Sequence, residues 1–172
     1  MSVFEAPDFD HHEAVAFFDD KASGLRAIIA IHSTALGPAC GGTRMFKYAT
    51  TEDALTDALR LSRGMSYKSA IANLPLGGGK AVIIGDPARD KTDALFLAYA
   101  NAINTLAGRY VTAMDVGMTA KDMPVIARGT KYIAGFDQPG NQPLGGQIDL
   151  MRGTCQGLPF EQTHHDAIGF AA

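Results

Sequence analysis

The chain has 172 residues, a formal net charge of −3, 47% hydrophobic residues and 19% charged residues. This length is enough for one domain with a substantial core, and the slightly acidic balance gives no sign of a nucleic-acid partner. No apolar run approaches the ~20 residues of a membrane-spanning helix, and residues 1–5 lack the basic stretch of a secretion signal. The two cysteines, Cys40 and Cys155, show neither metal-ligand spacing nor a disulfide framework. We therefore expect a soluble cytoplasmic protein without a metal site.

The first part of the chain has the pattern of strands. Residues 12–32 predict an antiparallel hairpin, because two apolar arms flank a polar turn at residues 19–24. A glycine-rich strand is expected over residues 37–45. Within it, Gly41 and Gly42 indicate a close approach by a ligand or by another backbone.

A helix is predicted after this strand. Thr50 is its expected N-cap, and acidic residues follow in the first turn, where they suit the helix dipole. Gly64 is expected to interrupt the helix, so that a second helical piece runs over residues 65–74.

The pattern of strand and helix then alternates. Residues 80–84 predict a strand, residues 92–108 a helix and residues 110–113 a short strand. Thr119 is expected to cap a brief helix, and residues 132–136 to form a last strand. This order predicts an α/β fold, a three-layer α/β/α arrangement with a mainly parallel sheet and an antiparallel N-terminal hairpin.

The last part of the chain differs in kind. Residues 138–172 hold six glycines and three prolines among 35 residues and show no clear period. We expect one domain over residues 1–137, followed by an irregular tail. Within that tail, His164 and His165 are more typical of a solvated pair than of a metal site.

Lysine chemistry is suggested by one segment. The glycines of residues 77–79 precede Lys80, directly ahead of an apolar run. Read as a loop, they would let a ligand approach while the strand behind aims the lysine. Burial near another cation, such as Lys68, would lower the lysine pKa and let a neutral amine accept a proton. A charged Lys68 could hold a carboxylate or phosphate. The alternative is that both lysines are solvated surface residues.

A carboxylate is predicted at the edge of the sheet. Asp115 lies just past the end of the strand expected at residues 110–113, and ligands of open α/β sheets bind at that edge. The side chain could pair with a substrate ammonium or relay a proton. The alternative is a turn-forming aspartate without a chemical role.

Nucleotide-binding motifs are not matched. A phosphate-binding loop needs Ser or Thr after its lysine and Gly at its start, but Ala81 and Leu74 occupy those positions. No G-x-G-x-x-G follows any predicted strand, so no cofactor-binding residue is predicted.

Three stretches, residues 37–45, 48–65 and 74–87, resemble the substrate-binding domain of the Glu/Leu/Phe/Val amino-acid dehydrogenases, most closely that of the leucine dehydrogenases. The resemblance runs from about residue 25 to residue 137. It implies reversible oxidative deamination, in which an L-amino acid and NAD give a 2-oxo acid, ammonium and NADH. It also implies a homo-oligomer assembled largely through this domain.

The resemblance implies roles for individual positions. Lys80 would activate water and move protons, Asp115 would assist at the amino group, and Lys68 would grip the substrate carboxylate. Further substrate contacts are implied for Gly41, Gly42, Met65, Cys40 and Ala113. Cys40 stands where the leucine dehydrogenases carry leucine, so the preferred side chain stays open.

Members of this family continue into a second domain that binds the dinucleotide. Residues 138–172 offer neither the pattern nor the length of such a domain. We therefore expect a domain that is inactive, or nearly so, by itself. Two alternatives stay open: a module that binds amino or 2-oxo acids without chemistry, and an oligomerisation partner.

Overall fold

The computed structural model describes residues 2–135, which form five strands and three α-helices after a 3₁₀ turn at Val3–Glu5. The strands are β1 (Ala14–Asp20), β2 (Leu25–Ser33), β3 (Ala39–Phe46), β4 (Gly77–Ile84) and β5 (Tyr110–Met114). The helices are α1 (Thr51–Ile71), α2 (Asp93–Thr105) and α3 (Met123–Gly129). None of the helices in this part of the chain is long and apolar enough to cross a bilayer.

The strands form one sheet in the order β1-β2-β4-β3-β5. Strands β3, β4 and β5 run parallel to one another, whereas β2 pairs antiparallel with both β1 and β4. The predicted α/β class and the antiparallel hairpin are confirmed. The sheet is mixed, because the whole hairpin joins the parallel strands through an antiparallel β2–β4 contact.

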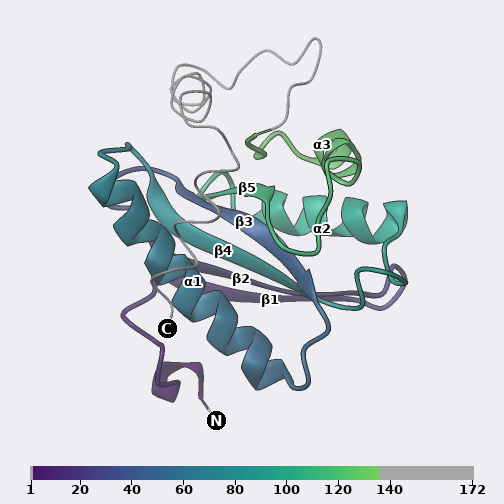
Figure 1. Ribbon diagram of the computed structural model, residues 1–172, viewed down its shortest axis with the longest axis horizontal. Helices are drawn as coiled ribbons and strands as arrows, with labels where there is room; N and C mark the ends of the chain where they lie inside the picture. The colour runs from purple at the N-terminus through teal and green to yellow at the C-terminus, as the bar shows by residue number, and fades with distance from the viewer. Residues whose placement is uncertain (1, 136–172) are drawn as a thin grey trace. The chain divides into compact units, whose positions relative to one another are not determined.

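Helices cover both faces of the sheet, as predicted (Figure 1). Strand β2 shows why its apolar run is unbroken: alternate side chains enter two different cores. Ile28 and Ala30 pack toward α1, in a cluster with Ala54, Ala58 and Val82. Their neighbours pack on the other face, in a larger cluster that includes Ile29, Ile31, Tyr99, Ile103 and Ile126.

The predicted helix cap at Thr50 is confirmed, and the helix predicted from residue 92 has a similar cap. The Thr50 hydroxyl accepts from the Asp53 backbone N–H, and the Asp53 carboxylate accepts from the Thr50 backbone N–H, which makes a capping box. The Thr92 hydroxyl accepts from the backbone N–H of Leu95 in the same way at α2. Both caps depend on residues only three positions apart, which is why such a cap can be recognised from local sequence.

Three local predictions were wrong. Helix α1 continues through Gly64 without a break and ends at Ile71. A mid-helix glycine costs only about 1 kcal/mol, which packing of the helix against the sheet outweighs. The last helix begins at Met123 rather than at a Thr119 cap. Near residue 133, the described part of the predicted last strand makes only an isolated bridge to β5. Residues 138–172, with His164 and His165, lie outside the described residues.

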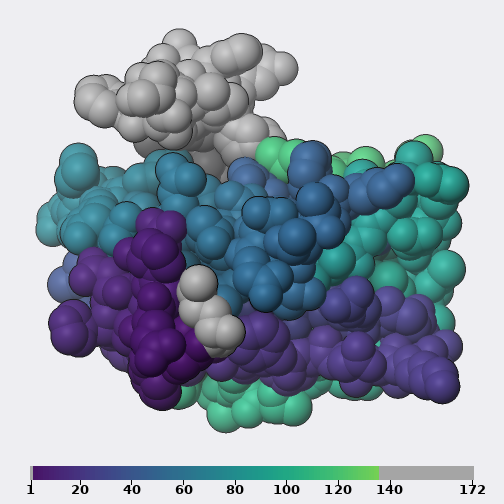
Figure 2. All heavy atoms as spheres, turned by 90° about the horizontal axis from the view of Figure 1, so that it is seen from below, coloured from purple at the N-terminus to yellow at the C-terminus, as the bar shows by residue number. Residues whose placement is uncertain are grey.

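The amino-terminal segment is anchored on α1 by a buried histidine. The Nε2 of His12 lies 3.1 Å from the carbonyl oxygen of Leu59 and 3.0 Å from Oγ of Ser62. Its Nδ1 accepts from the backbone N–H of Asp10, so the ring is neutral with the proton on Nε2. Figure 2 shows the purple amino-terminal residues against the blue residues of α1.

Candidate active site

The candidate site starts from a row of residues across three parallel strands. Gly42 of β3 is the register partner of Ala113 of β5, and the flanking β3–β4 pairs place Gly42 level with Lys80. Lys80 also pairs with Ala30 of β2, whose side chain belongs to the core under α1. Directly paired residues share a face, so this row faces the α1 side of the sheet.

The glycine at the centre of the row explains how Lys80 reaches across the sheet. Strands lie about 4.8 Å apart, and β3 separates β4 from β5. A Cβ at Gly42 would lie 2.7 Å from Cβ of Asp115, closer than real Cβ atoms come. Without that side chain, Lys80 Nζ lies 2.5 Å from Oδ2 of Asp115, which follows the end of β5. Gly42 therefore makes room for the ion pair.

Lys80 and Asp115, two residues that sequence analysis singled out separately, are thus brought into direct contact. Their side chains are only 7% and 12% exposed, so the pair is largely removed from water. Burial of this degree makes each charge depend on its partner.

A second cation, Arg44 of β3, also contacts this carboxylate. Its Nε donates to Oδ2 of Asp115 at 3.2 Å, and its NH1 donates to Oδ2 of Asp57, on α1, at 2.8 Å. The hydroxyl of Tyr48 donates to the same Asp57 oxygen at 2.8 Å. The result is a continuous chain of alternating charges from Lys80 through Asp115 and Arg44 to Asp57, which ends at the neutral hydroxyl of Tyr48.

The pKa values in this chain follow from burial and from the neighbouring charges. Burial lowers the pKa of Lys80 below its usual value; Asp115 opposes this shift, and the Arg44 charge adds to it. Burial disfavours the charged form of Asp115, but Lys80 and Arg44 outweigh it and hold the carboxyl pKa below its usual value. The site therefore combines a stable carboxylate with an amine that gives up its proton more readily than a solvated lysine.

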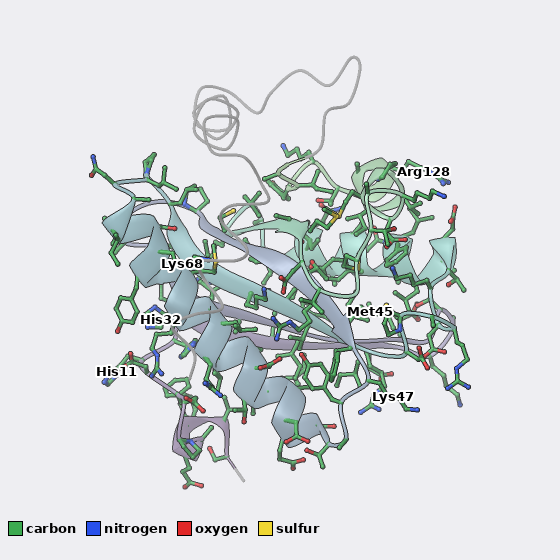
Figure 3. All side chains as sticks on the ribbon, in the orientation of Figure 1. His11, His32, Met45, Lys47, Lys68 and Arg128 are labelled. Carbon is green, nitrogen blue, oxygen red and sulfur yellow. The ribbon has the colours of Figure 1, made fainter. Side chains whose placement is uncertain are left out.

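Arg44 takes the place that sequence analysis gave to Lys68 as the cation lowering the pKa of Lys80. Lys68 is exposed and lies on the second half of α1 (Figure 3). It follows Asp57 by about three helical turns, so both side chains leave α1 on the side facing β3. Lys68 thus lies on the same side of the helix as the site without pairing with Lys80. Met65 is one turn before it and half-buried.

The glycine run before Lys80 is not a loop: residues 77–79 belong to β4 itself. A Cβ at Gly78 would collide with Ser66 of α1, and one at Gly79 would lie 2.7 Å from the ring of Tyr110. These glycines are required because a helix and an aromatic ring press on the two faces of the strand. The ligand loop predicted for them was wrong.

Gly41 lies next to Gly42 on β3 but faces the opposite side of the sheet. A Cβ there would collide with the carbonyl of Gly79, and the Gly41 carbonyl accepts from the Tyr110 hydroxyl at 2.7 Å. Cys40 is half-buried and, by strand alternation, shares the α1 side with Gly42. Of the residues implied as substrate contacts on the sheet, Cys40, Gly42 and Ala113 thus share the face of Lys80, and Gly41 lies on the opposite face.

Sequence analysis missed Arg44, Asp57 and Tyr48. A signal was present: Arg44 lies two residues after Gly42, so the predicted strand already placed it on the same face. Asp57 could not be connected to it before the position of α1 against β3 was known.

The described residues offer no cradle for a dinucleotide at the glycine run, because protein atoms fill the space beside Gly77, Gly78 and Gly79. Such a cradle needs glycines in a turn that leads into a helix, and these lie inside a strand. No group of three or more metal-ligating side chains occurs within residues 2–135.

Comparisons with known proteins agree with this architecture. The family model described as "Glu/Leu/Phe/Val dehydrogenase, dimerisation domain" matches residues 11–132. The chain is 52% identical over 157 residues to a leucine dehydrogenase of Geobacillus stearothermophilus, covering 89% of this chain and 43% of that protein. It is 57% identical over 154 residues to a valine dehydrogenase of Streptomyces coelicolor, covering 89% of this chain and 42% of that protein.

Solved structures show the same fold. The crystal structure of L-tryptophan dehydrogenase from Nostoc punctiforme matches with a TM-score of 0.69 and 53% identity, over 71% of this chain and 36% of that one. A glutamate dehydrogenase of Thermus thermophilus, at 22% identity and a TM-score of 0.57, covers 73% of this chain and 33% of that one and shares the fold alone. The chain spans less than half the length of these relatives. The chain belongs to the Glu/Leu/Phe/Val dehydrogenase family.

Proposed function

We propose that this chain forms the substrate-binding and proton-transfer half of an NAD-dependent L-amino-acid dehydrogenase, which converts an L-amino acid reversibly into a 2-oxo acid and ammonium. The observation that carries the proposal is the buried pair of Lys80 and Asp115. An apolar side chain is favoured for the substrate, because similar proteins are named leucine, valine and L-tryptophan dehydrogenases.

In this proposal each charged group has one task. Lys80 accepts the proton of the water that attacks the substrate Cα carbon, since its lowered pKa favours the neutral amine. Asp115 stays ionised and assists at the departing amino group. Lys68, exposed on α1, binds the substrate carboxylate and fixes its orientation. Cys40 and Ala113 line the side-chain end of the substrate pocket, and Gly42 and Met65 form other parts of it. Gly41 precedes Gly42 on the opposite face of β3 and makes no direct contact with the substrate.

The oxidant, NAD, would take a hydride from Cα. The described residues do not fit this group, so residues 2–135 are assigned only substrate binding and proton transfer. We propose that a further domain supplies the dinucleotide, and that this chain is inactive or nearly so without it.

Self-association is also proposed. The matching family model is described as a dimerisation domain. Sedimentation velocity of the pure chain tests this point: we expect a species larger than a monomer at micromolar concentration, and a strict monomer contradicts it.

A chimera tests the catalytic proposal. Residues 1–135 replace the segment they match in the Geobacillus stearothermophilus leucine dehydrogenase, and NADH formation is followed with L-leucine, L-valine, L-tryptophan and L-glutamate. We expect turnover with apolar substrates and a loss of about 10²–10⁴-fold in kcat for Lys80→Ala, the usual size of a general acid–base contribution.

Two controls accompany this assay. Lys68→Ala is expected to raise KM, because it removes a binding contact. Lys21→Ala, in the hairpin turn, is expected to change neither constant. A chimera that folds and turns over while Lys80→Ala keeps full activity contradicts the assignment of Lys80.

A further inference from the structure

Arg44 joins two carboxylates that come from different parts of the fold. One edge of its guanidinium contacts Asp115 at the end of β5, and another contacts Asp57 on α1. The Arg44 side chain is 23% exposed, and those of Asp115 and Asp57 are 12% and 30% exposed. A planar guanidinium with several donors suits such a bridge, whereas the single ammonium of lysine does not.

Asp57 is itself held in place. The Tyr48 hydroxyl donates to the same Asp57 oxygen that accepts from Arg44. Burial raises the pKa of Tyr48 well above its usual value, and Asp57 adds to the shift, so the phenol stays protonated and remains a donor. Arg44 is thereby supported from α1 and from the segment that precedes it.

Asp115 depends on this support because its Oδ2 accepts from two cations. Lys80 approaches it from β4 and Arg44 from β3. A carboxylate held by a lysine alone can rotate with that flexible side chain. A second, rigid donor fixes its direction.

We propose that Arg44, supported by Asp57 and Tyr48, is a positioning residue that holds Asp115 against Lys80 and links this pair to α1. The inference rests on the proposed function, since it assigns Lys80 and Asp115 as the reacting groups. It gives α1 a second role beyond carrying Lys68: through Asp57 and Arg44, the helix fixes the orientation of the Asp115 carboxylate.

The charges of this network act on Lys80 in opposite directions. Arg44 lowers the pKa of Lys80, and Asp57 raises it. Loss of the Arg44 charge should therefore move the titration of Lys80 to higher pH, and loss of the Asp57 charge should move it to lower pH. General loosening of the structure would not produce opposite signs.

The test is a pH titration of the Lys80 Cε resonance by carbon-13 NMR in the full chain. Both cations contact Oδ2 of Asp115, Lys80 at 2.5 Å and Arg44 at 3.2 Å. Coulomb's law for two charges this close, at an effective dielectric constant of about 20, leads us to expect that Arg44→Gln raises the midpoint by about two pH units. Asp57→Asn, which keeps the acceptor oxygen but removes the charge, should lower it. Arg26→Gln is the matched control, because Arg26 contacts the exposed Asp19 away from the site. It should leave the midpoint unchanged.

Kinetics of the chimera provide a second measurement. Arg44→Gln should lower kcat about 10- to 100-fold with little change in KM, and shift the rising limb of the pH–rate profile upward. Arg44→Lys keeps the positive charge, so the Lys80 midpoint should return toward its wild-type value while kcat stays low. This variant is used in place of Arg44→Gln if Arg44→Gln does not fold. An unchanged Lys80 midpoint in Arg44→Gln, shifts of the same sign in Arg44→Gln and Asp57→Asn, or full kcat in Arg44→Lys overturns the proposal. An inactive wild-type chimera with the expected midpoints counts against the proposed function and leaves the positioning role supported.

Discussion

Replacing Asp115 by asparagine should turn the buried pair into a pH-dependent defect. The substitution keeps the shape of the side chain but removes its negative charge. Lys80, which is 5% exposed, then lies beside the Arg44 cation, with Asp57 as a more distant anion. An uncompensated buried charge is strongly unfavourable, so the ammonium will give up its proton instead.

The expected loss of stability follows from that deprotonation. Removing one partner of a buried ion pair lowers the free energy of unfolding by about 3–5 kcal/mol. The loss cannot exceed the free energy needed to deprotonate a lysine whose pKa in the unfolded chain is about 10.4. That free energy is about 4.6 kcal/mol at pH 7 and about 0.7 kcal/mol at pH 10. We therefore expect Asp115→Asn to cost about 3–4 kcal/mol at pH 7 and less than about 1 kcal/mol at pH 10.

The sign of the pH dependence can be checked separately. Asp115 raises the pKa of Lys80 in the folded protein, so its removal lowers that pKa further. Between the folded and unfolded pKa values, the unfolded chain binds more protons than the folded one. Stability of the variant therefore rises with pH across this window.

Guanidinium chloride unfolding followed by circular dichroism at several pH values measures the effect. Asp19→Asn is the matched control, because Asp19 is exposed and lies 4.0 Å from Arg26. It should change stability by less than about 0.5 kcal/mol. In the double variant Lys80→Met/Asp115→Asn, much of the loss should be recovered, since no buried charge remains unpaired. A loss below about 1 kcal/mol at pH 7, or an equal loss at pH 7 and pH 10, would refute this reasoning.

Two other substitutions test the glycines, and one tests the buried histidine. Gly79→Ala should destabilise the fold by about 1–3 kcal/mol, because its Cβ would lie 2.7 Å from the fully buried ring of Tyr110. Gly64→Ala should instead stabilise the fold by about 0.5–1 kcal/mol, because no atom lies within 4 Å of the added Cβ and alanine favours the helix. Chemical unfolding measures both variants, and changes of the same sign in the free energy of unfolding refute this account. Burial lowers the pKa of His12, so the folded state resists protonation and stability should fall as pH drops below about 6.5. His12→Gln should show a shallower loss between pH 7 and pH 5, and an identical profile contradicts the assignment.

Part of this fold was accessible from local pattern. The turn of the β1–β2 hairpin, the cap at Thr50 and the start of α2 near Thr92 depend on residues close together in sequence, and they were predicted correctly. The predicted break at Gly64 was wrong. Local propensity favours a break there, and only the packing of α1 on the sheet keeps the helix continuous.

The candidate site shows the same division. The sequence by itself determined which groups are chemically notable: a lysine after three glycines, and an aspartate at the end of a strand. The alternation of side chains along the predicted strand also puts Arg44 on the face of Gly42, although sequence analysis did not single it out. Only the tertiary structure decided that Lys80 reaches Asp115 over a side-chain-free position, and that Arg44 rather than Lys68 is the neighbouring cation. Contacts across β4, β3 and α1 join residues distant in the chain, and no local spacing encodes the distance between them.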